Sequence, residues 1–198
     1  MIAIVDYGMG NLRNVERALA AVGHRSQITS DPRVLDKADK IILPGVGAFG
    51  EAVKRIDGLN LRNSIITRAR QGVSLLGICL GMQLLYEESE ENPGARGLGL
   101  LEGSIKKFEP GLKVPHVGWN DVAVVGSSAI FDGERNATFY FVHSFYAPIG
   151  DHTVGQTEYG VTFSSAIQKG TIFGVQFHPE KSQKPGLALL GRFAALVN

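Results

Sequence analysis

The stretch Gly-Ile-Cys-Leu-Gly-Met-Gln at residues 77–83 contains the only cysteine among the 198 residues of the chain. An apolar run at residues 73–78 leads into Cys79, and a helix-like run at residues 82–86 leaves it. Cys79 therefore lies where a buried strand turns sharply into a helix. The flanking glycines fit such a turn, because its central residue is strained and the positions beside it have no room for side chains.

Two interpretations of Cys79 stay open at this point. In the first, the thiol stands exposed at the end of a strand above the positive end of a helix, whose field favours a reactive thiolate. In the second, Cys79 is a small buried apolar residue, which is how most free cysteines behave. The rest of the chain has to decide between them.

Length and composition favour one domain spanning residues 1–198. A formal net charge of +1 gives no electrostatic footprint for nucleic acid or for an acidic membrane surface. One cysteine cannot form an internal disulfide, the first residues do not resemble a secretory signal, and no apolar run is long enough to span a bilayer. We therefore expect a cytoplasmic protein.

Strand-like and helical patterns alternate through the first half of the chain, which predicts a flavodoxin-like, doubly wound and mostly parallel sheet with helices on both faces. The second half changes character, with strand-like runs and short connections that predict an antiparallel extension of the sheet. Residues 115–120 are expected to form a turn, and a last helix is expected from about Pro185. The expected strands are residues 2–5, 27–29, 40–43, 73–78, 122–125, 138–142, 153–158, 165–167 and 171–177.

A glycine-rich loop, residues 44–50, follows the expected strand at residues 40–43. Such a loop can turn backbone N–H groups toward an anion or an oxyanion, although flexible strand-to-helix loops often have the same composition. The earlier pair Gly8 and Gly10 lacks the third glycine of a dinucleotide fingerprint and does not predict nucleotide binding.

His178 and Glu180 flank Pro179 where the last expected strand ends. A thiol nucleophile needs a base to take its proton and an acid to return that proton to a leaving amine, and imidazole performs both roles near neutral pH. A carboxylate on the other ring nitrogen fixes the tautomer and supports the imidazolium. Alternation along an extended strand would place the two side chains on the same side, unless Pro179 bends the chain there.

The order of these motifs, a Pro-Gly-Val-Gly loop, then Gly-Ile-Cys-Leu-Gly-Met-Gln, then His-Pro-Glu, resembles the class I glutamine amidotransferases over essentially the whole chain. Further segments resemble one branch of that family, the glutaminase subunits of imidazole glycerol phosphate synthase in histidine biosynthesis. Met82 also favours this branch, because the anthranilate and carbamoyl-phosphate relatives typically carry His there and lack the Gly-Trp-Asn stretch. The branch-specific segments are residues 6–12, 84–89, 116–120 and 143–146.

The resemblance implies a mechanism in which Cys79 attacks the side-chain amide of glutamine, with His178 and Glu180 completing the triad. It implies an oxyanion site made by the backbone N–H groups of Val46 and Leu80, and it implies neither a metal nor a cofactor. It also implies a substrate site. One of its residues, Glu91, is explained equally well as part of a solvated helix end. The implied substrate residues are Gly45, Gly47, Gln83, Glu91, Ser144 and Phe145.

Ammonia released into bulk water would be protonated and would lose its nucleophilicity, so a partner with an acceptor site is expected. The resemblance implies a heterodimer with a cyclase subunit, a (β/α)8 barrel that receives ammonia through an internal channel. In the enzymes that this heterodimer would resemble, the cyclase makes imidazole glycerol phosphate and an aminoimidazole carboxamide ribotide. The docking candidates are Asn11, Trp119, Tyr140 and Lys181, although Trp119 is also explained as a surface aromatic covering a core edge.

Three alternatives stay open from the sequence. The chain could be the glutaminase of another class I amidotransferase or a stand-alone cysteine hydrolase or peptidase on a similar fold. It could also be a non-catalytic regulatory binder, which would tolerate the loss of Cys79.

Overall fold

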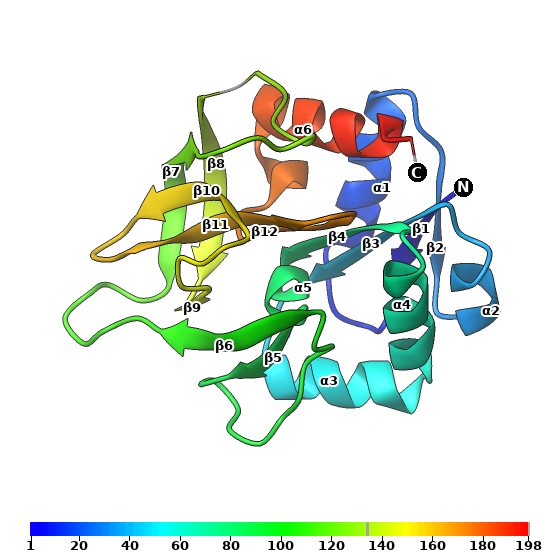
Figure 1. Ribbon diagram of the computed structural model, residues 1–198, viewed down its shortest axis with the longest axis horizontal. Helices are drawn as coiled ribbons and strands as arrows, with labels where there is room; N and C mark the ends of the chain where they lie inside the picture. The colour runs from blue at the N-terminus through cyan, green and yellow to red at the C-terminus, as the bar shows by residue number, and fades with distance from the viewer. Residues whose placement is uncertain (134, 198) are drawn as a thin grey trace.

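A nine-stranded mixed sheet of order β2-β1-β3-β4-β12-β11-β10-β7-β8 forms the centre of the fold (Figure 1). The computed structural model describes residues 1–133 and 135–197. The strands of this sheet are β1 (Ile2–Val5), β2 (Ser26–Thr29), β3 (Lys40–Gly45), β4 (Ser74–Cys79), β7 (His116–Val124), β8 (Asn136–His143), β10 (Thr153–Glu158), β11 (Thr162–Lys169) and β12 (Ile172–Val175).

The first five strands in the sheet order pair in parallel, and the remaining four extend the sheet in antiparallel fashion. The parallel order, 2-1-3-4 followed by β12, is that of flavodoxin-like sheets. All six residues of β4 are buried, as expected for a central parallel strand that is covered on both faces. The predicted parallel sheet with an antiparallel extension is confirmed.

Helices cover both faces of the parallel part (Figure 1). On one face, α1 (Leu12–Ala21) packs against α6 (Gln183–Ala195), and on the other α3 (Phe49–Gly58) packs against α4 (Leu61–Arg70). A short helix, α2 (Pro32–Leu35), begins where Asp31 accepts a hydrogen bond from the backbone of Arg33 at 2.9 Å, so Asp31 caps this helix and Pro32 is its first residue.

The structure differs from the sequence expectation after Cys79, at residues 101–107, where no strand was expected, and at residues 115–120. The helix after Cys79, α5 (Leu80–Gln83), has four residues, and the expected continuation at Tyr86 is instead a strand, β5 (Tyr86–Ser89). This strand joins β6 (Leu101–Lys107) and β9 (Phe145–Tyr146) in a second sheet. The expected turn at residues 115–120 is mostly strand β7, because it pairs residue by residue with β8. Pairing with distant strands outweighed the local helix pattern after Cys79 and the local turn pattern at residues 115–120.

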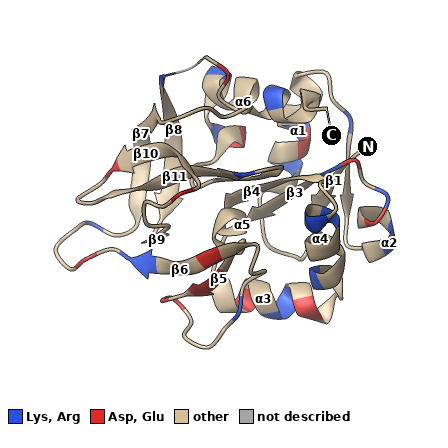
Figure 2. Cartoon of the chain, in the orientation of Figure 1, with Lys and Arg blue, Asp and Glu red and all other residues tan. Residues whose placement is uncertain are grey.

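Charged residues of both signs lie along α3, whereas β4 carries none (Figure 2). This distribution fits an exposed helix lying over a buried strand. In the part of the chain that the structure describes, no helix combines the length and the apolar character required to cross a membrane.

Candidate active site

Cys79 is the last residue of β4 and caps the start of α5 in a strained backbone conformation, with φ of 55° and ψ of −111°. Non-glycine residues with positive φ cost about 1–3 kcal/mol and cluster at functional sites. The glycines on either side are required for packing. A Cβ at Gly81 would lie 1.7 Å from the carbonyl oxygen of Leu43, and one at Gly77 would lie 2.6 Å from that of Gly81. The predicted sharp strand-to-helix turn is therefore present.

The field of a long helix beneath the thiol is absent, since α5 is only four residues long. The positive charge near the sulfur of Cys79 comes instead from a side chain just after the neighbouring strand. His178 follows β12, the strand beside β4, and couples electrostatically to Cys79.

His178 and Glu180 form a buried ion pair, with 2.8 Å between the Nδ1 of the ring and the Oε1 of the carboxylate. Their side chains are 2% and 1% exposed. The two side chains do not meet through the expected alternation along a strand. Residues 179–181 instead form a 3₁₀ turn, η1 (Pro179–Lys181), that brings the carboxylate of Glu180 back to the ring of His178. Asn11 donates a further hydrogen bond of 3.4 Å to Oε1 of Glu180.

The backbone of His178 is fixed to β8 by a closed set of hydrogen bonds. The N–H of His178 donates to the carbonyl of Tyr140 at 2.9 Å, and the Ser182 hydroxyl donates to the carbonyl of His178 at 2.6 Å. The same hydroxyl oxygen accepts from the N–H of Tyr140 at 2.9 Å. Because both ends of η1 are held, the imidazole has a defined position over the site.

Burial lowers the pKa of His178, but the charge of the Cys79 thiolate and the hydrogen-bonded carboxylate of Glu180 raise it by more, to about 10. The ring is therefore an imidazolium at neutral pH. Among the described residues, the Nε2 of His178 has no hydrogen-bond partner, so this nitrogen is available to the sulfur of Cys79. An imidazolium beside a cysteine is the arrangement that activates thiols for nucleophilic attack.

The predicted oxyanion loop lies directly beside Cys79. Gly45 ends β3 in register with Cys79, and Val46 and Gly47 follow it at the same edge of the sheet. Tyr7, which sequence reasoning missed, donates its hydroxyl to the Pro44 carbonyl at 2.8 Å. Burial and the nearby Cys79 charge raise the pKa of Tyr7, so the hydroxyl stays protonated and able to hold this loop. A Cβ at Gly45 would lie 2.3 Å from that hydroxyl, which explains the glycine.

A cavity of about 490 Å³ opens at this edge of the sheet. It brings together many of the residues singled out from the sequence, whereas Gly45, His178, Glu180, Trp119 and Tyr140 lie outside its lining. The cavity is lined by Asn11, Val46, Gly47, Cys79, Leu80, Gln83, Glu91, Pro115, Val142, His143, Ser144, Phe145 and Lys181.

Two candidate substrate residues already have partners within the chain. Gln83 donates from its side-chain amide to the carbonyl of Phe145 at 3.1 Å and to Oε1 of Gln176 at 3.0 Å. Glu91 accepts from the N–H of Phe49 at 2.8 Å, at the first turn of α3. Glu91 is thus neither the end of a helix nor freely solvated, because it follows β5 in a loop that folds back onto α3.

Sequence reasoning also missed the groups that touch the sulfur. The amide of Gln176 donates to the sulfur of Cys79 at 3.7 Å, and the carbonyl oxygen of Val142 lies at the same distance from the sulfur. Gln176 is fully buried. The sequence signal that could have indicated it is a polar side chain between two apolar residues, just before His178. Nothing in the local pattern could have indicated Val142, since its role depends on a backbone carbonyl.

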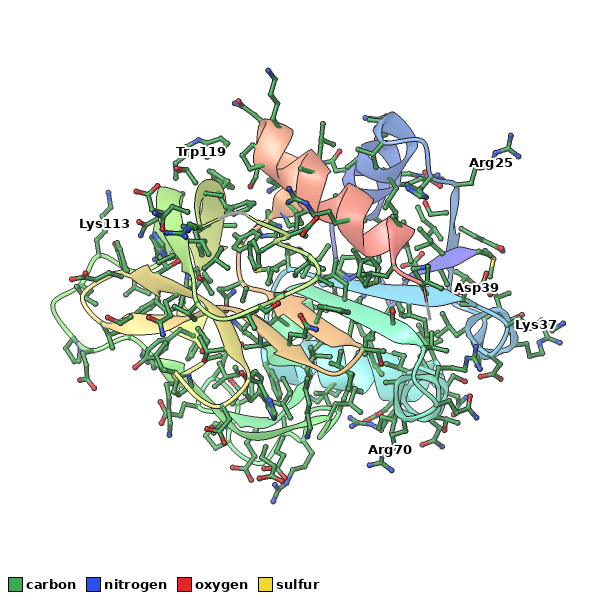
Figure 3. The ribbon with its side chains drawn as sticks, turned by 45° about the horizontal axis from the view of Figure 1, so that its top comes forward. Arg25, Lys37, Asp39, Arg70, Lys113 and Trp119 are labelled. Carbon is green, nitrogen blue, oxygen red and sulfur yellow. The ribbon has the colours of Figure 1, made fainter. Side chains whose placement is uncertain are left out.

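Three of the docking candidates form one cluster at the surface. Trp119 is 49% exposed and projects from β7 (Figure 3), with its ring 6.1 Å from that of Tyr140. The ammonium of Lys181 lies 5.7 Å from the centre of the Tyr140 ring. Trp119 is about half exposed, which fits a docking residue and a surface aromatic over a core edge equally, and Lys181 connects this cluster to the cavity that it lines.

Comparison with known proteins agrees with this geometry. The family model described as glutamine amidotransferase class-I matches residues 3–195. The chain belongs to the class I glutamine amidotransferases.

Relatives of this amidotransferase include two proteins named imidazole glycerol phosphate synthase subunit HisH. The one from Methanothermobacter thermautotrophicus is 46% identical over 198 residues, which covers 100% of this chain and 99% of the relative. The one from Thermococcus kodakarensis is 49% identical over 203 residues, which covers 99% of this chain and 100% of the relative. The family and the branch predicted from the sequence are thereby confirmed.

The solved structures show the same fold at lower identity. A crystal structure of a glutamine amidotransferase matches with a TM-score of 0.79 and 20% identity, covering 99% of this chain and 100% of that one. The structure of PurLQS from Thermotoga maritima matches with a TM-score of 0.74 and 22% identity, covering 97% and 96%. The mixed parallel and antiparallel sheet is therefore a property that this amidotransferase shares with these structures.

Proposed function

We propose that this chain is the glutaminase subunit of imidazole glycerol phosphate synthase and that it acts in histidine biosynthesis. It hydrolyses L-glutamine to glutamate and ammonia and passes the ammonia to a cyclase subunit. The observation that carries the reaction is the strained Cys79 beside an imidazolium, His178, that Glu180 holds in place. The full-length relatives named as subunits of this synthase support the branch.

In the first half of the reaction, the Cys79 thiolate attacks the amide carbon of glutamine. The negative charge that develops on the amide oxygen is held by the N–H groups of Leu80 and Val46, each worth about 3 kcal/mol of barrier. His178 gives its proton to the departing nitrogen, so ammonia leaves and a thioester remains on the sulfur. Glu180 supports the charge of the ring before this transfer and keeps its tautomer fixed afterwards.

In the second half, water attacks the thioester carbon while His178 takes a proton from that water. The carbon–sulfur bond breaks, glutamate leaves, and the thiolate–imidazolium pair is restored. Gln83, Ser144, Phe145, Glu91, Gly45 and Gly47 hold the glutamine during both halves. The internal partners of Gln83 and Glu91 give these two residues a role in shaping the wall of the cavity as well.

The ammonia is received by a (β/α)8-barrel cyclase subunit, which docks as a heterodimer partner over the mouth of the cavity. Trp119, Tyr140, Lys181 and Asn11 form the docking face. An exposed tryptophan in edge-to-face contact with a tyrosine is the kind of group that supplies binding energy at the centre of an interface. Covering the mouth keeps ammonia away from water, where protonation would end its reactivity.

The test is a glutamine hydrolysis assay of the chain alone and with the cyclase subunit and its nucleotide substrate. We expect low activity alone and strong stimulation in the complex. Trp119→Ala should reduce stimulation by at least tenfold. Lys181→Ala should also reduce it, and Lys184→Ala, at an exposed lysine on α6, is the matched control for that variant. High activity of the isolated chain would contradict the coupling, and release of peptide fragments in place of glutamate would favour a peptidase.

A further inference from the structure

A pair of buried histidines lies next to the cavity and has no part in the reaction described above. His116 on β7 and His143 on β8 stand directly opposite each other in the antiparallel ladder. They are 3% and 5% exposed, and 2.9 Å separates the Nδ1 of His116 from the Nε2 of His143. His143 is followed at once by Ser144 and Phe145, which line the cavity.

The hydrogen-bond partners of this pair determine where the protons are. The carbonyl of Phe145 can only accept, so the Nδ1 of His143, 2.8 Å away, carries a proton and its Nε2 is an acceptor. The Nδ1 of His116 must then donate to that Nε2, which leaves the Nε2 of His116 as an acceptor. Asn120 completes the chain by donating to it at 3.3 Å.

The orientation of the Asn120 amide is fixed independently. Its oxygen accepts from the N–H of Asp121 at 2.8 Å, and its nitrogen also donates to the carbonyl of Glu158 at 3.0 Å. The amide nitrogen therefore faces His116, and the three groups form one directed chain of N–H donors that ends at Phe145.

Aromatic rings surround the pair and exclude water. His116 lies between Tyr159 and Phe141, with ring centres 4.0 Å and 5.0 Å away. His143 lies within 5.6 Å of the rings of Phe108, Phe141 and Phe163. This burial lowers the pKa of both histidines, to about 3 for His143, so the pair is neutral at physiological pH.

The carbonyl at the end of the chain is shared with the cavity wall. Phe145 accepts from His143 on one side and from Gln83 on the other, and Gln83 also donates to Gln176, which contacts the sulfur of Cys79. The segment from His143 to Phe145 is thus held by side chains from β7, β8 and α5. Its position depends on the donor that His116 supplies.

We infer that His116 and His143 are positioning residues that hold Ser144 and Phe145 in the conformation that binds glutamine. This inference rests on the proposed glutaminase function. Loss of the His116 donor leaves the Nε2 of His143 without a partner in an apolar site, so the His143 ring and the Phe145 carbonyl lose their fixed orientation. Contacts made equally to bound glutamine and to the transition state are weakened, which raises KM and leaves kcat nearly unchanged.

The test compares His116→Leu with His116→Asn in the full-length protein, measured with the cyclase subunit present. The asparagine nitrogen can replace the Nδ1–H donor, whereas leucine cannot. We expect His116→Leu to raise KM for glutamine at least fivefold with kcat changed less than threefold, and His116→Asn to restore most of the KM. The same exchange at a half-buried surface histidine, His24→Leu, is the control and should change neither value.

The outcomes separate this inference from the proposed function. No glutamine hydrolysis by the wild type would overturn the proposed function, whereas normal hydrolysis with an unchanged KM in His116→Leu would overturn the positioning role alone. Equal loss in both His116 variants would mean that ring packing, not the donor, matters, and would also overturn it. If His116→Leu does not fold, nitrogen NMR of the wild type decides, since both rings must be neutral with the proton on Nδ1 and the opposite tautomer at either ring refutes the inference.

Discussion

Two buried pairs, His178–Glu180 and His116–His143, lie close together at the same edge of the sheet, and their histidines are in opposite states of charge. His178 faces a carboxylate and a thiolate, and its pKa is raised to about 10. His143 faces only another imidazole and a carbonyl, and burial lowers its pKa to about 3. Both rings are almost inaccessible to solvent, so burial by itself does not decide the charge of a histidine in this protein.

The difference shows how the site separates chemistry from positioning. A buried imidazole loses its proton unless a negative group nearby compensates for the lost solvation. Glu180 and the Cys79 thiolate provide that compensation for the group that has to deliver a proton. The His116–His143 pair has none, so its fixed tautomers act as hydrogen-bonding groups of constant direction.

Removal of the charged histidine should have the largest effect on the reaction. His178→Gln leaves no group to give a proton to ammonia or to take one from water, so we expect kcat for glutamine to fall by about 10³-fold. Steady-state kinetics of the complex measures this, with His24→Gln as the matched control. A His178→Gln enzyme that retains a tenth of the wild-type kcat would contradict the assigned role.

Removal of the carboxylate alone should have the next largest effect. Glu180→Gln keeps an acceptor for Nδ1 but removes the charge that supports the imidazolium, and we expect kcat to fall about 10²-fold with little change in KM. Glu109→Gln, at an exposed position, is the control. A change confined to KM would place Glu180 in substrate binding instead.

The thiolate also contributes to the difference between the two pairs. Cys79→Ala removes one of the negative groups that raise the pKa of His178, so this pKa should fall by at least about one unit, a tenfold change in proton affinity. A proton NMR titration of the histidine ring signals measures it. The His143 signals should not move, and an unchanged His178 pKa would show that Glu180 alone sets its charge.

The smallest expected effect is on stability. The contributions of His178 and His143 to the free energy of unfolding should change with pH in opposite directions. The folded pKa of His178 is raised from 6.5 to about 10, so its stabilisation is complete below pH 6.5 and is lost as the pH rises toward 10. The folded pKa of His143 is lowered from 6.5 to about 3, so its contribution is complete above pH 6.5 and is lost as the pH falls.

Urea unfolding at a series of pH values measures these slopes, and each can reach about 1.4 kcal/mol per pH unit for one proton. His178→Gln should reduce the slope on the alkaline side, and His143→Gln the slope on the acidic side. Variants that leave both slopes as in the wild type would contradict the assigned protonation states.

The parts of the fold that depend on local pattern could be predicted from the sequence. The elbow at Cys79 is specified by its own glycines and by the apolar run before it, and the parallel pairing of the first strands follows from their alternation with helices. Strand β5 and the first part of β7 were missed because their residues resemble a helix end and a turn until their partners, β6 and β8, are in place.

The candidate site divides in the same way. His178 and Glu180 are close in the chain and could be paired from their spacing, although the 3₁₀ turn that joins them was not foreseen. Tyr7, Gln176 and the His116–His143 pair act across long separations through single hydrogen bonds. No local pattern encodes such contacts, and only the assembled sheet brings them to the carboxyl ends of β3, β4 and β12.

The central claim, that Cys79 attacks glutamine with the help of His178, can be tested most directly by covalent labelling with a glutamine analogue that carries a chloroketone in place of its side-chain amide. Because Cys79 is the only cysteine, peptide mass spectrometry locates the label without ambiguity. We predict one label per chain on Cys79, slowed by added glutamine and by His178→Gln, with glutaminase activity lost in proportion. Labelling at another residue, or labelling of Cys79 that neither glutamine nor His178→Gln slows, would contradict the account.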